Sequence, residues 1–100
     1  MCKVVNKYKE EYDIYIGRGS MWGNPYKIGE DGTREEVIYK FKKLLWNLMK
    51  SGSISDDDLL ELDGKRLGCF CKPRDCHGDV IVQAVEYVKQ RRRLIQMRDK

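Results

Sequence analysis

Three of the four cysteines and the only histidine of this 100-residue chain lie within nine positions, from Cys69 to His77. Thiolates and imidazole are ligands that Zn²⁺ prefers in proteins, and a thiol beside an imidazole can act as a nucleophile. The cluster lies where a strand pattern gives way to the start of a helix, a common place for chemistry in α/β folds. It is therefore the first candidate site, for a metal ion or for a reactive thiol.

A zinc site is the first interpretation of this cluster, with ligands drawn from Cys69, Cys71, Cys76 and His77. Cys69 and Cys71 are two apart on a predicted strand, so their side chains point to the same face. The spacing C-x-C-x4-C-H lacks the two-residue gap of a zinc knuckle, and adjacent Cys76 and His77 rarely both reach one ion. A three-cysteine site with an open position, or one completed by Cys2, is an alternative.

A reactive thiol is the second interpretation. Asp75 is a suitable N-cap for the following helix, which would place Cys76 in the first turn. Backbone N–H groups and the positive end of the helix dipole lower a thiol pKa there, and Lys72 and Arg74 act in the same direction. Cys76 would then be nucleophilic or redox-active, with His77 as its base.

A purely structural role is the third interpretation. Cys69 and Cys71 would then be small buried hydrophobic residues, and His77 a surface or capping residue. The sequence leaves the three interpretations open, and with them the question whether the protein is an enzyme.

A long irregular segment, residues 18–32, is the second candidate site. It contains or adjoins Gly17, Gly19 and Gly23. These glycines let the backbone come close to a partner, Arg18 can bind an anion, and Trp22 or Tyr26 can stack on a ring. The segment matches neither a P-loop nor the dinucleotide fingerprint. The segment indicates a phosphate-bearing or nucleotide-like ligand. The alternative interpretation is an ordered surface loop in which Trp22 packs inward to hold the loop in place.

The elements around these segments follow from hydrophobic periodicity and capping signals. We predict strands near Val4–Val5 and over 12–17 and 65–71, and helices over 34–50, over 55–62 and from Asp75 or Gly78 to about Arg93. The order β-β-α-α-β-α predicts a small α/β domain over residues 1–88, with a partly parallel sheet flanked by helices. Because the loops after parallel strands emerge at one sheet edge, residues 18–32 and 72–78 should converge there.

Composition places limits on partners. The net charge is +4, and residues 89–100 carry six cationic side chains and one carboxylate, so the rest of the chain is nearly neutral. This basic C-terminal helix end can contact nucleic acid or a host protein, or it can be a solvated helix end. The sequence has no apolar run of membrane-spanning length and no signal peptide pattern, so we expect a cytoplasmic protein with unpaired thiols and no membrane partner.

Six motifs in order resemble the family known as domain of unknown function 4326, which occurs in bacteriophages and bacteria. They are YDIYIGR (12–18), WGNP (22–25), TRE (33–35), GKRL (64–67), CFC (69–71) and CHGD (76–79). The resemblance implies a phage-type accessory protein, acting in the host cytoplasm, in which both loops belong to one signature. Besides the cysteine cluster, it marks as candidate ligand-binding residues Asp13, Arg18, Trp22, Asn24, Arg34 and Asp79.

Two functional hypotheses follow. In the first, Arg18, Arg34 and the start of the last helix hold a nucleotide-like or phosphorylated molecule, and Cys76 and His77 lie nearest any chemistry. In the second, zinc only stabilises the fold, and the basic tail binds nucleic acid or a host protein without catalysis.

Overall fold

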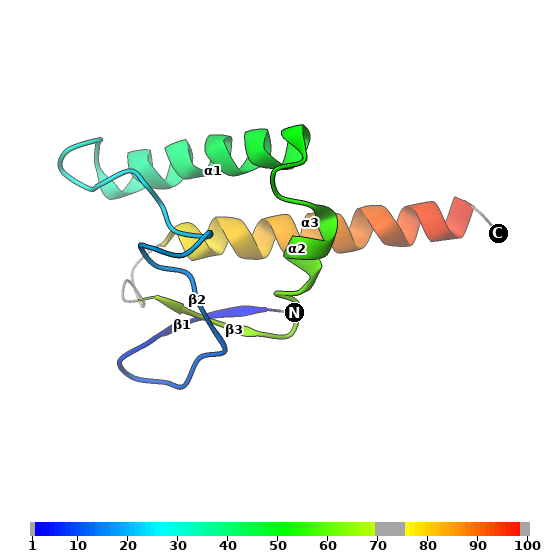
Figure 1. Cartoon of the computed structure of the whole chain (residues 1–100), viewed down its shortest axis with the longest axis horizontal. Helices are drawn as coiled ribbons and strands as arrows, with labels where there is room; N and C mark the ends of the chain where they lie inside the picture. Colours follow the sequence, from blue (N-terminus) through cyan, green and yellow to red (C-terminus); the bar gives the residue numbers. More distant parts are fainter. Residues whose placement is uncertain (1, 70–75, 99–100) are drawn as a thin grey trace.

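The computed structural model describes residues 2–69 and 76–98, with side chains described as far as Leu94. The elements in chain order are β1 (Lys3–Asn6), β2 (Ile14–Tyr15), α1 (Arg34–Ser51), α2 (Asp56–Leu60), β3 (Arg66–Cys69) and α3 (His77–Arg98). Figure 1 shows that α3 runs between the sheet and α1, and that α2 lies beside α3. The predicted α/β class and the element order are therefore confirmed.

The sheet has the order β1-β3-β2, and both strand pairs of the described sheet are parallel. Asn6 pairs with Cys69, and Tyr15 pairs with Gly68, so all three strands end at the same edge. β2 is shorter than the predicted strand over 12–17, although Ile16 N–H still donates to the Gly68 carbonyl at 3.0 Å. β2 and β3, which the two candidate loops follow in the sequence, therefore both end at this edge.

One side of α3 supplies much of the core. Ile81, Val85 and Val88 are fully buried, and they pack in the same cluster as Leu67 of the sheet and Leu45 of α1. This apolar stripe recurs every three to four residues, as expected for a helix buried along one face. The core therefore lies in the layers that hold α3 against both the sheet and α1.

A capping box starts α1, as the sequence predicted. Glu36 N–H donates to Thr33 Oγ1 at 3.3 Å, and Thr33 N–H donates to Glu36 Oε1 at 3.1 Å. These hydrogen bonds to its charged form lower the pKa of Glu36. Because α1 supplies one wall of the site described below, this cap also fixes where that wall begins.

We expect Thr33→Ala to lower the free energy of unfolding by about 1 kcal/mol, because the first turn of α1 loses its hydroxyl acceptor. Urea denaturation followed by circular dichroism measures this change. Thr33→Ser keeps the hydroxyl and should remain close to wild type. Equal stability of the serine and alanine variants would contradict the role of the cap.

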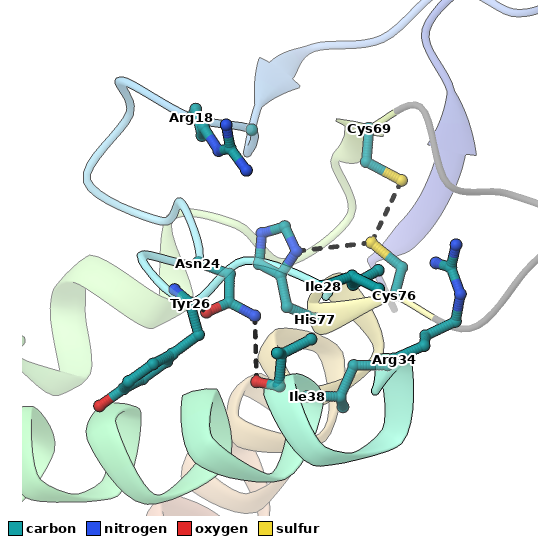
Figure 2. Close-up of a pocket in the computed structure, with 11 residues that line it drawn as sticks. Arg18, Asn24, Tyr26, Ile28, Arg34, Ile38, Cys69, Cys76 and His77 are labelled. Carbon is teal, nitrogen blue, oxygen red and sulfur yellow. Dashed lines mark hydrogen bonds between the residues drawn. The ribbon is translucent and has the colours of Figure 1, made fainter. Parts of the chain in front are cut away.

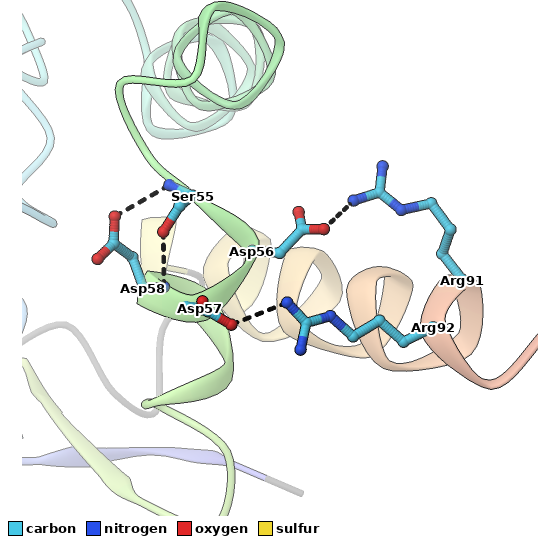
Figure 3. Close-up of polar contacts among 6 residues, drawn as sticks. All are labelled: Ser55, Asp56, Asp57, Asp58, Arg91 and Arg92. Atoms are coloured by element: carbon cyan, nitrogen blue, oxygen red, sulfur yellow. Dashed lines mark hydrogen bonds and ion pairs between the residues drawn. The ribbon is translucent and has the colours of Figure 1, made fainter. Parts of the chain in front are cut away.

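α3 continues to Arg98, beyond the predicted end near Arg93. Just before that predicted end, α3 contacts α2 through two arginines (Figure 3). Arg92 Nη2 lies 2.8 Å from Asp57 Oδ1, and Arg91 pairs with Asp56. Asp58 instead completes a capping box with Ser55. In the acidic first turn of α2, Asp58 therefore caps the helix N-terminus, while Asp56 and Asp57 form ion pairs with two arginines of α3.

These contacts neutralise part of the basic helix end. Lys89 Nζ lies 3.2 Å from Asp63 Oδ1, a contact that lowers the pKa of the Asp63 carboxyl. Three of the four cationic side chains that the structure describes after residue 88 therefore have carboxylate partners; the fourth is Arg93. A surface of this kind presents less free positive charge to nucleic acid than the sequence alone indicates.

Candidate functional site

A cavity of about 260 Å³ lies where the glycine-rich segment meets the start of α3 (Figure 2). The segment after β2 contributes Arg18, Asn24 and Tyr26, α1 contributes Arg34 and Ile38, and the chain around β3 and α3 contributes Cys69, Cys76 and His77. The predicted convergence of residues 18–32 with residues 72–78 is therefore seen for the described end of the second loop, residues 76–78, while residues 72–75 lie outside the described residues.

His77 is held by the backbone at the end of β2. Its Nε2 lies 2.7 Å from the Ile16 carbonyl oxygen, and its ring meets Phe41 edge-on at 4.9 Å between centroids. A carbonyl oxygen can only accept a hydrogen bond, so Nε2 carries the proton. In the neutral ring Nδ1 is then an acceptor, and it faces Cys76 Sγ at 3.6 Å.

Cys76 directly precedes α3, in the N-cap position. Gly78 N–H donates to its Sγ at 3.4 Å, and its own N–H donates to Asp79 Oδ2 at 3.2 Å. This pattern resembles a capping box, with a cysteine in the place usually taken by serine or threonine, but the N–H that donates to the sulfur is at N2 rather than N3. The motif Cys-His-Gly-Asp therefore has a structural explanation.

The position of the cap corrects one prediction. Because α3 begins at His77, the N-cap position falls on Cys76 and not on Asp75, which lies outside the described residues together with Lys72 and Arg74. Cys76 is consequently just before the first turn rather than within it. The Gly78 N–H at the helix start still donates to its sulfur.

The two described thiols at the cavity are close together. Cys69 Sγ, at the end of β3, lies 3.3 Å from Cys76 Sγ, and both residues are almost fully buried. A second polarisable sulfur therefore adjoins the cap.

The two arginines on the cavity wall come from different elements. Arg18 is exposed on the glycine-rich segment and has no hydrogen-bond or ion-pair partner among the described residues, whereas Arg34 opens α1. In the view of Figure 2, Cys76 and His77 lie between these arginines. The cavity thus combines cationic walls with the thiol–imidazole pair.

Three predicted ligand-binding residues lie away from this cavity. Trp22 is 5% exposed in the hydrophobic core, where its large apolar ring is removed from water. Asp13 accepts from Arg66 N–H at 2.7 Å, a hydrogen bond that lowers the pKa of its carboxyl. Asp79 caps α3. The structure gives each of the three a local structural role.

Asn24 lines the cavity, but its side-chain amide forms hydrogen bonds within the protein. Its Nδ2 donates to the Val37 carbonyl at 3.1 Å, and its Oδ1 accepts from Tyr26 N–H at 3.0 Å. The residue therefore fastens the glycine-rich segment to α1. Sequence reasoning had no signal for this, nor for Ile28, Val37 and Ile38, which complete the apolar wall.

The described residues do not complete a metal site. No group of three or more potential ligands is placed around one point within residues 2–69 and 76–94, and Cys71 lies outside the described residues. Cys2 was an alternative ligand, but it precedes Lys3, which pairs with Arg66 at the end of the strands opposite Cys69. Cys2 is therefore excluded, and zinc binding stays a prediction.

The fold and the site together define a small α/β protein with a cavity at the carboxyl edge of a parallel sheet. The chain belongs to the family described as Domain of unknown function (DUF4326), whose profile matches residues 2–87. The resemblance found in the motifs is thereby confirmed.

Two relatives show where this family occurs. An "Uncharacterized 12.4 kDa protein in nrdA-td intergenic region" of Enterobacteria phage T4 is 50% identical over 86 residues, covering 85% of this chain and 78% of the relative. "Uncharacterized protein R718" of Acanthamoeba polyphaga mimivirus is 29% identical over 106 residues, covering 85% of this chain and 75% of the relative. No solved structure matches the chain. Within the described residues, none of the helices has both the length and the apolar character needed to cross a membrane.

Proposed function

We propose that the cavity binds a small phosphate-bearing, nucleotide-like molecule. The observation that carries this proposal is the exposed Arg18 guanidinium, which has no protein partner among the described residues and shares a cavity wall with Arg34. Guanidinium groups bind phosphate through paired, charge-assisted hydrogen bonds. An unpaired arginine at a cavity is well suited to an anionic ligand.

The size and lining of the cavity favour a compact ligand. Its volume of about 260 Å³ lies near the lower limit of small-molecule pockets, about 300 Å³, and so suits a mononucleotide better than a dinucleotide. Tyr26 offers an aromatic ring at the wall, in place of the buried Trp22. The phosphate end would lie at the arginines, and the apolar end at Tyr26, Ile28 and Ile38.

Replacing Arg18 by alanine should weaken binding of a nucleoside 5′-monophosphate by about tenfold or more, because a charge-assisted hydrogen bond contributes roughly 1.5–3 kcal/mol. Isothermal titration calorimetry of the whole chain, with each of the four common ribonucleotides, measures this change. Inorganic phosphate and the nucleosides alone, as further titrants, separate the anionic contribution from the ring contribution.

Arg93→Ala is the matched control. Arg93 is exposed on α3 away from the cavity, so its loss removes the same charge without touching the site. Equal affinities of the Arg18 and Arg93 variants, or no binding of any phosphate compound by the wild-type chain, would refute the proposed function.

A further inference from the structure

A thiol–imidazole pair on the wall of the cavity goes beyond what ligand binding requires. We infer that Cys76 is a nucleophile that bonds to an electrophilic carbon of the ligand, with His77 taking the thiol proton. The class of ligand, a phosphate-bearing molecule with a carbon that carries a leaving group, rests on the proposed function. The reactivity of the thiol itself rests on the geometry of Cys76 and His77.

The orientation of His77 is the first support. The Ile16 carbonyl, 2.7 Å from Nε2, leaves Nδ1 as the ring acceptor, and Nδ1 faces Cys76 Sγ at 3.6 Å. A base whose far nitrogen is fixed by a third group is the recurring arrangement for activating a thiol or hydroxyl nucleophile. Because sulfur is larger than oxygen or nitrogen, this separation is within hydrogen-bonding distance for a thiol and an imidazole.

The surroundings of the sulfur are the second support. Gly78 N–H already donates to Cys76 Sγ. The Cys76 thiol donates to Cys69 Sγ at 3.3 Å, and the Cys69 thiol can donate in the opposite direction once Cys76 has lost its proton. Donors directed at a sulfur favour its thiolate.

The chemical step balances within these groups. The proton of Cys76 Sγ moves to His77 Nδ1, and the resulting thiolate donates an electron pair to the ligand carbon. As the S–C bond forms, the bond from that carbon to its leaving group breaks. The leaving group departs with the bonding pair, and the imidazolium can supply its proton. No oxidant or metal takes part in this step.

Alkylation tests the nucleophile without knowledge of the natural ligand. The folded chain is treated at pH 7 with limiting iodoacetamide, and the modified peptides are identified by mass spectrometry. We expect Cys76 to be modified before Cys2, Cys69 and Cys71. Preferential labelling of another cysteine would overturn the inference, and this result does not depend on any variant being folded.

His77→Gln is the variant that tests the base. A glutamine amide can still donate to the Ile16 carbonyl, but it cannot accept a proton from the thiol. We expect the iodoacetamide rate at Cys76 to fall by about tenfold, the change in thiolate fraction for one pKa unit. An unchanged rate in a variant with wild-type thermal stability would overturn the role of His77.

The charge of the alkylating reagent separates this inference from the proposed function. Iodoacetate carries a carboxylate, so the arginines should favour it over neutral iodoacetamide. Arg18→Ala should lower the iodoacetate-to-iodoacetamide rate ratio severalfold, whereas the distant control Arg93→Ala should leave this ratio at the wild-type value. A ratio that does not move, with Cys76 still labelled first, supports the nucleophile and counts against the anion site.

Discussion

Replacing Ile81 by alanine should lower the free energy of unfolding by about 2–5 kcal/mol. Ile81 is fully buried in the cluster that joins α3 to the sheet and to α1. Its truncation leaves a cavity, because the sheet and α1 cannot both close on α3 to fill the space. A chain of this length is stabilised by only about 5–15 kcal/mol, so the loss is a large fraction of the total. Guanidinium chloride denaturation measures it.

Leu94→Ala is the control for this substitution. Leu94 lies on the same helix but is 62% exposed, so its loss should change the stability by no more than about 0.5 kcal/mol. Similar losses for the two variants would mean that α3 is not buried along the side that the structure shows.

Gly78→Val should have the second large effect, on both stability and thiol reactivity. A Cβ atom at Gly78 would lie 2.7 Å from Ile16 Cδ1 and 2.9 Å from Val4 Cγ2, closer than carbon atoms approach. The start of α3 or the side chains of Ile16 and Val4 must then shift, at a cost of about 1–3 kcal/mol. We expect part of this shift to fall on the helix start and to separate His77 from the Ile16 carbonyl, so iodoacetamide should label Cys76 more slowly.

Gln90→Val separates crowding from the helix propensity of valine. Gln90 is exposed in the middle of α3, so this variant keeps the start of the helix intact. We expect it to label at the wild-type rate and to lose only a few tenths of a kcal/mol. Thermal unfolding and alkylation on the two variants give the comparison, and a wild-type labelling rate in Gly78→Val would contradict the packing argument.

Local signals in the sequence were sufficient for most of the fold. The capping box at Thr33 and Glu36 and the apolar spacing of α1 depend on neighbouring residues only, and both are confirmed. The parallel arrangement followed from chain order, because a strand–helix–strand connection returns to the same edge. The meeting of the two loops was therefore predictable as well.

The roles of individual residues at the site were less predictable, because they depend on tertiary contacts. Trp22 and Asp13 have residue types that suit ligands, yet one fills the core and the other pairs with Arg66 across the sheet. The cap at Cys76 was missed because serine, threonine, asparagine and aspartate are the usual N-caps, and Asp75 stood next to it. No pattern in the sequence indicated that a carbonyl of β2 orients His77.

The hydrogen bond between Ile16 and His77 makes the two halves of the site thermodynamically dependent on each other. Ile16 is followed directly by Gly17 and Arg18, so the residue that orients the imidazole is two residues along the chain from the arginine proposed to bind the anion. Any ligand that repositions this stretch changes the free energy of the thiol–imidazole pair. By linkage, modification of Cys76 must alter the affinity for that ligand by the same factor.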